Sequence, residues 1–235
     1  MVKPQLPSAY DLVVLEGERD PVARACALAR DRGSDGTLVW ADRPDRLSLA
    51  LLLEPDADLR TTALDWHTFT VAAQDALAGL TLAAYPLHFR FPNRVLFDGC
   101  ELARLRCVWP RRTAPCERPA WIVFGLEAEM QEPAEPGAQP ERMTLAGAGA
   151  EAPPVAFVEA IARQFLYWLQ RRDAVGFEGV RRIWNHRLER RGELGSLRLG
   201  GIEAAGVIEG LDAEGLFRIG GQAIGLWDIP EEILA

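Results

Sequence analysis

The sequence predicts an α/β (α+β) protein, in which a mostly antiparallel sheet is backed by helices and followed by a small β-unit. Short apolar segments bounded by glycine, proline or aspartate alternate with longer segments whose apolar residues repeat at helical spacing. Beyond Gly192 only short glycine-bounded segments remain, which is typical of a small antiparallel barrel. The 235 residues are enough for one medium domain and a small companion. We expect residues 1–191 to form the first and residues 192–235 the second.

Each element is predicted from the period of its apolar residues and from the residues at its ends. Asp20 and Pro21 are typical of a helix start, Gly33 of a helix end, and the pair Asp98-Gly99 of a hairpin turn. In the first third of the chain we expect a strand over 11–17, a helix over 20–33, a hairpin of strands over 36–41 and 46–54, and a helix over 61–80. Four strands should follow, over 88–91, 95–97, 102–109 and 120–128. The remaining elements are helices through 157–169 and 177–188 and strands over 194–199, 202–208, 215–219 and 222–227.

The segment Gln131–Pro154 differs in composition from the rest of the chain. It is rich in proline, glycine, alanine and glutamate, and its apolar residues follow no sustained period. Such a segment has too little patterned apolar surface to bury as a helix or strand. We therefore expect most of it to be a mobile surface loop.

The balance of charges argues against binding to nucleic acids or to anionic membranes. Lys and Arg total 26 against 34 Asp and Glu, a formal net charge of −8, so no overall positive field gathers phosphates. The longest apolar run, Leu47–Leu53, is too short to span a bilayer, and the amino terminus has no basic and then apolar leader. We expect neither nucleic acid nor a membrane as a partner.

The cysteines and histidines show no arrangement that is typical of disulfides or metal sites. The cysteines are few and form no C-x-x-C pair, which suits free thiols in a reducing compartment, and we expect the protein to be cytoplasmic. The histidines lack the spacing of metal ligands, so we predict no metal. These residues are Cys26, Cys100, Cys107 and Cys116, and His67, His88 and His186.

A strand, a turn and a second strand carry the most informative motif. Residues 90–102 read R-F-P-N-R-V-L-F-D-G-C-E-L. This stretch resembles the biotin protein ligase and lipoate ligase family, in which a K-W-P-N-D strand is followed by a K-hydrophobic-A/G-G-I-L strand. Ala120–Met130 is similar to the family's next strand, which runs into G-x-G-I-N, and Gly201–Trp227 to its carboxy-terminal barrel. The resemblance implies a class II synthetase-like ligase domain followed by an SH3-like barrel.

The resemblance also implies a ligand site and its ligands. ATP and biotin or lipoate are the cofactors that it suggests, and it gives no further identity for the ligand of this chain. Trp40 ends the strand where the family's ligand loop would begin, so we expect its ring to stack on a ligand at the open side of the sheet. The positions that match ligand-binding segments of the family are Trp40, Arg43, Arg90, Pro92, Asn93, Arg94 and Gly125.

The family's glycine- and arginine-rich ligand loop is missing from this sequence. In the family a G-R-G-R-R-G loop follows the strand that matches Gly36–Ala41 and closes over the acyl-adenylate, where backbone N–H groups and arginines hold phosphate. Here Asp42-Arg43-Pro44-Asp45 joins the two strands, contains no glycine, and loses one backbone donor at Pro44.

The family's adenylation lysine is replaced by an acid. In the ligases this lysine begins the second strand of the motif and bridges the acid's carboxylate and the nucleotide's α-phosphate. Glu101 occupies the matching position, so a negative charge repels both groups, and Lys3 is the only lysine in the chain. Four arginines either rebuild a positive cleft or point to solvent, and the sequence leaves both alternatives open. They are Arg90, Arg94, Arg104 and Arg106.

A cysteine nucleophile is a further alternative. Some octanoyl and lipoyl transferases of the superfamily carry the acyl group on a cysteine, and Cys100 and Cys107 lie near the lysine position. A reactive thiol needs a lowered pKa and a nearby base, for which His88 is the available partner. Packing in the core is the commoner role of cysteine.

The leading hypothesis is a biotin/lipoate protein ligase-like protein that has lost ATP-dependent adenylation and binds a small acidic or acyl ligand or a carrier-protein partner. Three alternatives stay open: an active ligase that uses arginines, an acyltransferase that works through Cys100 or Cys107, and an interacting relative whose cleft is filled. The sequence leaves open whether the chain is an enzyme and whether it forms a homodimer.

Overall fold

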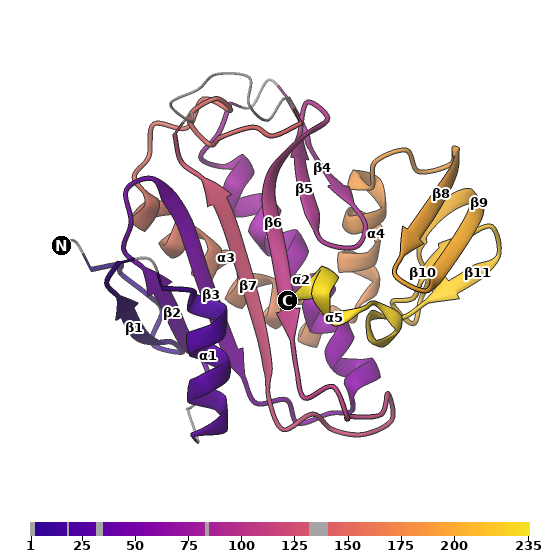
Figure 1. Ribbon diagram of the computed structural model, residues 1–235, viewed down its shortest axis with the longest axis horizontal. Helices are drawn as coiled ribbons and strands as arrows, with labels where there is room; N and C mark the ends of the chain where they lie inside the picture. Colours follow the sequence, from indigo (N-terminus) through magenta and orange to yellow (C-terminus); the bar gives the residue numbers. More distant parts are fainter. Residues whose placement is uncertain (1–2, 18, 32–34, 83–84, 132–140) are drawn as a thin grey trace.

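The computed structural model describes residues 3–17, 19–31, 35–82, 85–131 and 141–235, and its main feature is a seven-stranded sheet (Figure 1). Strands β1 and β2 pair in parallel, and all other neighbouring strands of this sheet are antiparallel, as the sequence predicts. In spatial order the strands are β1 (Asp11–Leu15), β2 (Thr37–Ala41), β3 (Arg46–Leu53), β7 (Ile122–Glu129), β6 (Cys100–Val108), β5 (Arg94–Phe97) and β4 (Leu87–Arg90).

Two long helices, α2 (Leu59–Ala78) and α3 (Pro154–Val175), cover one face of this sheet (Figure 1). The ring of Phe69 on α2 lies 5.4 Å from the rings of Phe124 on β7 and Phe165 on α3, so the three elements meet in one aromatic cluster. Fully buried aromatic rings of this size supply much of the apolar burial that stabilises a domain. Within the described residues, no helix is long and apolar enough to cross a bilayer.

The opposite face of the sheet is covered only in part. Helix α1 (Pro21–Arg30) begins at Asp20, whose carboxylate accepts a hydrogen bond from the Val22 amide at 2.9 Å. Val22 and the next turns of α1 pack on apolar side chains of β2, β3 and β7. Beyond them the sheet presents charged side chains that point away from α2 and α3. We call this region the polar face; it carries Arg46, Arg94, Glu101, Arg104, Arg106, Glu127 and Glu129.

The carboxy-terminal part forms a separate antiparallel sheet of four strands in the order β11-β10-β9-β8. The last predicted strand ends early, because Gly225 N donates to the Asp228 carboxylate at 2.7 Å and the chain turns into a short 3₁₀ helix (Leu226–Asp228). A final short helix, α5 (Glu231–Leu234), lies beside β6 in Figure 1. The strands are β8 (Leu194–Leu199), β9 (Ile202–Leu211), β10 (Phe217–Ile219) and β11 (Gln222–Ile224). The division at residue 192 and the SH3-like barrel stay predictions.

The small sheet is tied to the main part by buried polar contacts. Asn185, on helix α4 (Glu178–Arg187), accepts from the Leu211 amide at 2.7 Å and donates to its carbonyl at 2.9 Å, as a neighbouring strand would. His67 on α2 contacts the Gly215 carbonyl through Nε2 at 2.9 Å. These bonds satisfy polar groups that burial would otherwise leave without partners.

The expected mobile loop over 131–154 is wrong for its described second half. Met143 N donates to Glu101 O, and Leu145 N to Glu129 O, each at 2.9 Å, so this segment pairs with one end of β6 and of β7. Leu145 and Ala148 are fully buried. Composition missed this because the partners lie outside the segment. Residues 132–140 lie outside the described residues.

Burial of His67 makes stability depend on pH. Complete burial lowers the pKa of His67 from 6.5 to about 4. Below pH 6.5 the unfolded chain takes up a proton that the folded protein does not, so we expect the free energy of unfolding to fall as the pH drops from 6.5 towards 4. A shift of this size corresponds to roughly 3 kcal/mol. Urea unfolding between pH 7 and pH 4 measures it.

The control compares two glutamine variants. His67→Gln keeps a donor for the Gly215 carbonyl and should reduce this pH dependence, whereas His186→Gln changes an exposed histidine and should leave it unaltered. If the three proteins lose stability in parallel, the buried histidine is not the cause.

Candidate functional site

The Glu101 carboxylate is the centre of the polar face. Its Oε2 lies 2.8 Å from Arg94 Nη1, and its Oε1 lies 3.0 Å from Arg104 Nη2 and 3.9 Å from Arg142 Nη2. Only 9% of the Glu101 side chain is exposed, while each guanidinium is partly open to solvent. A carboxylate this deeply buried is stable only when cations compensate it.

A β-bulge turns Glu101 toward these arginines. In a regular strand residues 101 and 104 would point to opposite faces of the sheet. The register between β5 and β6 shifts so that Ala103 pairs with Val95 but Glu101 pairs with Leu96, and Leu102 becomes the extra residue. The Leu102 side chain joins the core on the helix-covered side, and Glu101 joins Arg104 on the polar face.

The polar face has more positive than negative groups at this point. Arg94, Arg104 and Arg142 surround Glu101, and Glu127 is the cross-strand neighbour of Arg104. Three guanidinium groups thus face two carboxylates, in a protein whose formal net charge is −8. This local excess favours an anionic ligand.

In the rest of the polar face the charged side chains form ion pairs, and helix α1 packs closely on the sheet. Arg46 Nη2 lies 2.5 Å from Glu129 Oε1, and Arg106 Nη1 lies 2.8 Å from the carboxylate of Asp20. At Gly125 an added Cβ would come within 2.4 Å of Val22 Cγ2 on α1. Gly125 is therefore required for close packing of the helix on the sheet.

Other residues that the resemblance singled out have partners away from Glu101. Arg90 donates to both carboxylate oxygens of Glu189 at 2.6 and 2.8 Å, and these hydrogen bonds raise the pKa of Arg90. Asn93 is buried and donates to the carbonyls of Leu105 at 3.1 Å and Ile233 at 2.8 Å. Pro92 lies between Asn93 and Phe91, whose ring stacks on Phe217 at 3.9 Å.

Trp40 and Arg43 differ from what the resemblance led us to expect. Trp40 is only 2% exposed and belongs to the core on the side of α2 and α3, so its ring does not reach the polar face. Both faces of β2 are buried, so nothing in its own sequence shows toward which face Trp40 points. Arg43 pairs with Asp45 through Nε at 3.0 Å and Nη2 at 2.5 Å, within the loop that joins β2 to β3.

The surroundings of Cys107 do not suit a nucleophile. Cys107 is completely buried, and burial raises its pKa well above the ordinary thiol value. Cys100 is partly exposed at the start of β6. His88 is aligned with Leu96 and Glu101 across β4, β5 and β6, which puts its backbone two strands, about 10 Å, from β6.

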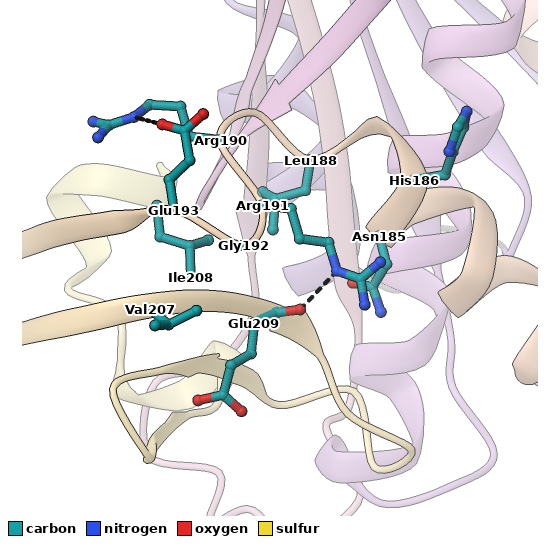
Figure 2. Close-up of a pocket in the computed structure, with 10 residues that line it drawn as sticks. All are labelled: Asn185, His186, Leu188, Arg190, Arg191, Gly192, Glu193, Val207, Ile208 and Glu209. Carbon is teal, nitrogen blue, oxygen red and sulfur yellow. Dashed lines mark hydrogen bonds and ion pairs between the residues drawn. The ribbon is translucent and has the colours of Figure 1, made fainter.

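A hollow of about 640 Å³ lies away from the polar face, between the end of α4 and strands β8 and β9 (Figure 2). Arg191 reaches across it and donates from Nε to the Glu209 carbonyl at 2.9 Å (Figure 2). None of the site residues predicted from the sequence lines it. The described residues include no cluster of three or more His, Cys, Asp or Glu side chains suited to a metal ion.

Sequence reasoning missed several partners of the site. Arg142 comes from the proline- and glycine-rich segment, which has no period to mark it, and Asp20 was interpreted only as a helix cap. Glu189 and Ile233 reach Arg90 and Asn93 from the far end of the chain. No local signal could have identified them, because each contact joins residues far apart in sequence.

Comparisons with known proteins agree with this fold. Residues 6–186 match the biotin/lipoate A/B protein ligase family. A biotin–[acetyl-CoA-carboxylase] ligase of Paracoccus denitrificans is 28% identical over 206 residues, which are 85% of each chain. A biotin protein ligase-like protein of unknown function from Silicibacter sp. TM1040 has a similar fold, with a TM-score of 0.83 and 24% identity, over 99% of this chain and 100% of that one. The biotin protein ligase of Aquifex aeolicus gives 0.70 and 19%, over 92% and 95%.

The ion pairs of Glu101 should contribute measurably to stability. Glu101→Gln keeps the size of the side chain but leaves three guanidinium groups facing each other, so we expect a loss of about 2 kcal/mol in the free energy of unfolding. Urea unfolding measures this loss, and added salt should reduce it, because salt screens repulsion between the exposed guanidinium groups.

Glu203→Gln is the matched control, because Glu203 pairs with Arg198 at 3.6 Å where both side chains are well exposed. Its expected loss is below about 0.5 kcal/mol. Equal losses in the two variants would contradict a special role for Glu101.

Proposed function

The chain belongs to the biotin/lipoate A/B protein ligase family, and we propose that it is a member without ATP-dependent ligase activity that binds a small acidic or acyl ligand on the polar face. The observation that carries the proposal is the Glu101 carboxylate, which is held by three arginines and which the resemblance of residues 90–102 to the ligases aligns with the adenylation lysine. Binding a ligand without activating it fits a site that has positive charge but no lysine.

Electrostatics opposes adenylation at this position. The lysine of the ligases brings together a carboxylate and an α-phosphate, two anions that repel each other until a cation lies between them. In this chain the ligand's carboxylate and the α-phosphate would both approach a third anion, the Glu101 carboxylate. One such pair of unit charges 4 Å apart is unfavourable by about 4 kcal/mol near a protein surface. Three guanidinium groups face two carboxylates here, so the excess positive charge can compensate one ligand anion but not a carboxylate and an α-phosphate together.

The surroundings of Glu101 support the same conclusion. The loop between β2 and β3 has no glycine and is bound internally through Arg43 and Asp45, so it lacks the flexible backbone that covers an adenylate in the ligases. In the motif that residues 101–106 resemble, a glycine and a leucine stand where this chain has Arg104 and Arg106. These side chains occupy the polar face themselves.

An arginine-dependent ligase is the second candidate. It is favoured by the group of Arg94, Arg104 and Arg142 and by the Paracoccus relative, which is named as a ligase that acts on acetyl-CoA carboxylase. A carrier domain is accordingly the second candidate partner. The buried Cys107 thiol and the distance from His88 to β6 argue against a thiol transferase.

The first experiment tests ligation. We expect no pyrophosphate release and no carrier modification above background when the protein is incubated with MgATP, biotin or lipoate, and an apo biotin-carrier domain. Losing one preorganised charge-stabilising group typically lowers a rate about 10²–10³-fold, and a group of opposite charge should lower it further. The Aquifex aeolicus ligase is the positive control.

Two outcomes would replace the proposal. Rapid modification that is lost in Arg94→Gln would establish the arginine-dependent ligase. Rapid ATP-independent acyl transfer that is lost in Cys100→Ser would establish the thiol transferase.

The second experiment tests ligand binding by thermal unfolding with biotin, lipoate and octanoate. A ligand at a hundred times its Kd should stabilise the folded protein by about 2.7 kcal/mol. We expect one of the three acids to raise the melting temperature and Arg104→Gln to weaken the effect. Arg198→Gln, which alters an exposed arginine in the small sheet, should leave the effect unchanged. If no acid stabilises the protein while an apo carrier domain binds to it, the ligand is the carrier.

A further inference from the structure

Arg111 carries the least satisfied charged group that we find in the described residues. It follows β6, and its guanidinium lies over the ring of Trp109 at 3.8 Å. Only 23% of the side chain is exposed, and burial lowers the pKa of Arg111. Nη1 donates to the Ile229 carbonyl at 3.3 Å, but Nε and Nη2 are buried without a hydrogen-bond partner among the described residues.

The unsatisfied edge is the one that other arginines of this protein use to bind carboxylates. In three of them Nε and Nη2 donate to the two different oxygens of one carboxylate, which is the bidentate geometry that suits carboxylate and phosphate oxygens. The pairs are Arg43 with Asp45, Arg90 with Glu189, and Arg181 with Glu178. Arg111 presents the same edge, and its guanidinium stacks on the Trp109 ring, but no oxygen of the described residues accepts a hydrogen bond from Nε or Nη2.

The carboxy-terminal segment lies over this edge. The Glu231 carboxylate is 3.8 Å from Arg111 Nε, too far for a hydrogen bond, and 54% of the Glu231 side chain is exposed. Asn93 anchors the segment by donating to the Ile233 carbonyl at 2.8 Å, and Leu234 is completely buried. In Figure 1 this last helix, which carries the chain's carboxy terminus, lies in front of β6.

We propose that Arg111 is the anion-binding residue of a site beside β6 for the carboxylate or phosphate group of a small ligand, and that Glu231 of the chain's own last helix occupies the place of that anion. A ligand oxygen pair would accept the two hydrogen bonds that Glu231 leaves unmade. Entry requires the carboxy-terminal segment to move, so ligand binding and displacement of α5 are coupled. The proposal does not rest on the loss of ligation, since an active ligase could hold the same anion.

The test compares charge-neutralising variants of the full-length protein. Inorganic phosphate and acetate are titrated by calorimetry at constant ionic strength. In Glu231→Gln the competing carboxylate is gone, so we expect the affinity for at least one anion to rise on the order of fivefold or more. Glu232→Gln makes the same change of net charge on the next residue, which has no ion pair with Arg111 in the described structure, and should alter the affinity less than about twofold.

Removing the Nε and Nη2 donors of Arg111 should abolish anion binding. Glu231→Gln combined with Arg111→Gln removes both charges of the pair and should show no saturable binding, and Arg111→Lys, which keeps the charge without the fork, should bind more weakly than Glu231→Gln. The ¹⁵N-bound Nε proton of Arg111, assigned by its loss in Arg111→Lys, gives a second readout, because it should shift when the anion binds.

The outcomes distinguish a phosphate ester from a carboxylic acid as the ligand and show whether the proposal holds. Stronger binding of phosphate alone identifies a phosphate ester as the ligand class, and stronger binding of acetate alone identifies a carboxylic acid. The proposal is overturned if neither anion binds more tightly to Glu231→Gln than to Glu232→Gln, or if binding persists unchanged after Arg111→Gln. Either result would make Arg111 a structural residue and would leave the proposed function unaffected.

Discussion

A buried carboxylate that requires nearby cations organises this protein's polar face. Glu101 joins β5, its own strand and the segment after β7, because its side chain contacts Arg94, Arg104 and Arg142 while its backbone exchanges hydrogen bonds with that segment. Without those cations the charge could not remain buried. The ion pairs therefore hold together, around one residue, elements that are distant in sequence.

The ion pairs of Glu101 show why a similar fold does not by itself imply a similar activity. The fold of the chain is similar to that of a biotin protein ligase over nearly its whole length. Fold similarity alone does not fix activity, which depends on particular groups at the site. In our proposal this chain has an anion, Glu101, where the ligases have their lysine, and the arginines around it stabilise that anion.

The carboxy-terminal part contributes to the site as well as to the fold. Asn185 and His67 bind the small sheet to the helices through hydrogen bonds. The last residues of the chain then lie beside β6, where Asn93 donates to the Ile233 carbonyl and Arg111 donates to the Ile229 carbonyl. A motif asparagine and an arginine outside the motif are thus both engaged by the end of the chain. Any ligand that needs these donors competes with the protein's own backbone and with Glu231.

The sequence by itself determined the features that arise locally. Apolar period and turn residues predicted the strands and helices, because each depends on near neighbours. The resemblance to the ligases led us to expect a missing ligand loop and an acid at the lysine position. The tertiary structure decided which way side chains point and what they meet. A β-bulge turns Glu101 onto the polar face, and Trp40 points into the core from β2, a strand that is buried on both faces. Arg142 and Glu231 contact Glu101 and Arg111 from segments that are distant in sequence. Register and long-range contact leave no period in the sequence, so only the folded chain shows them.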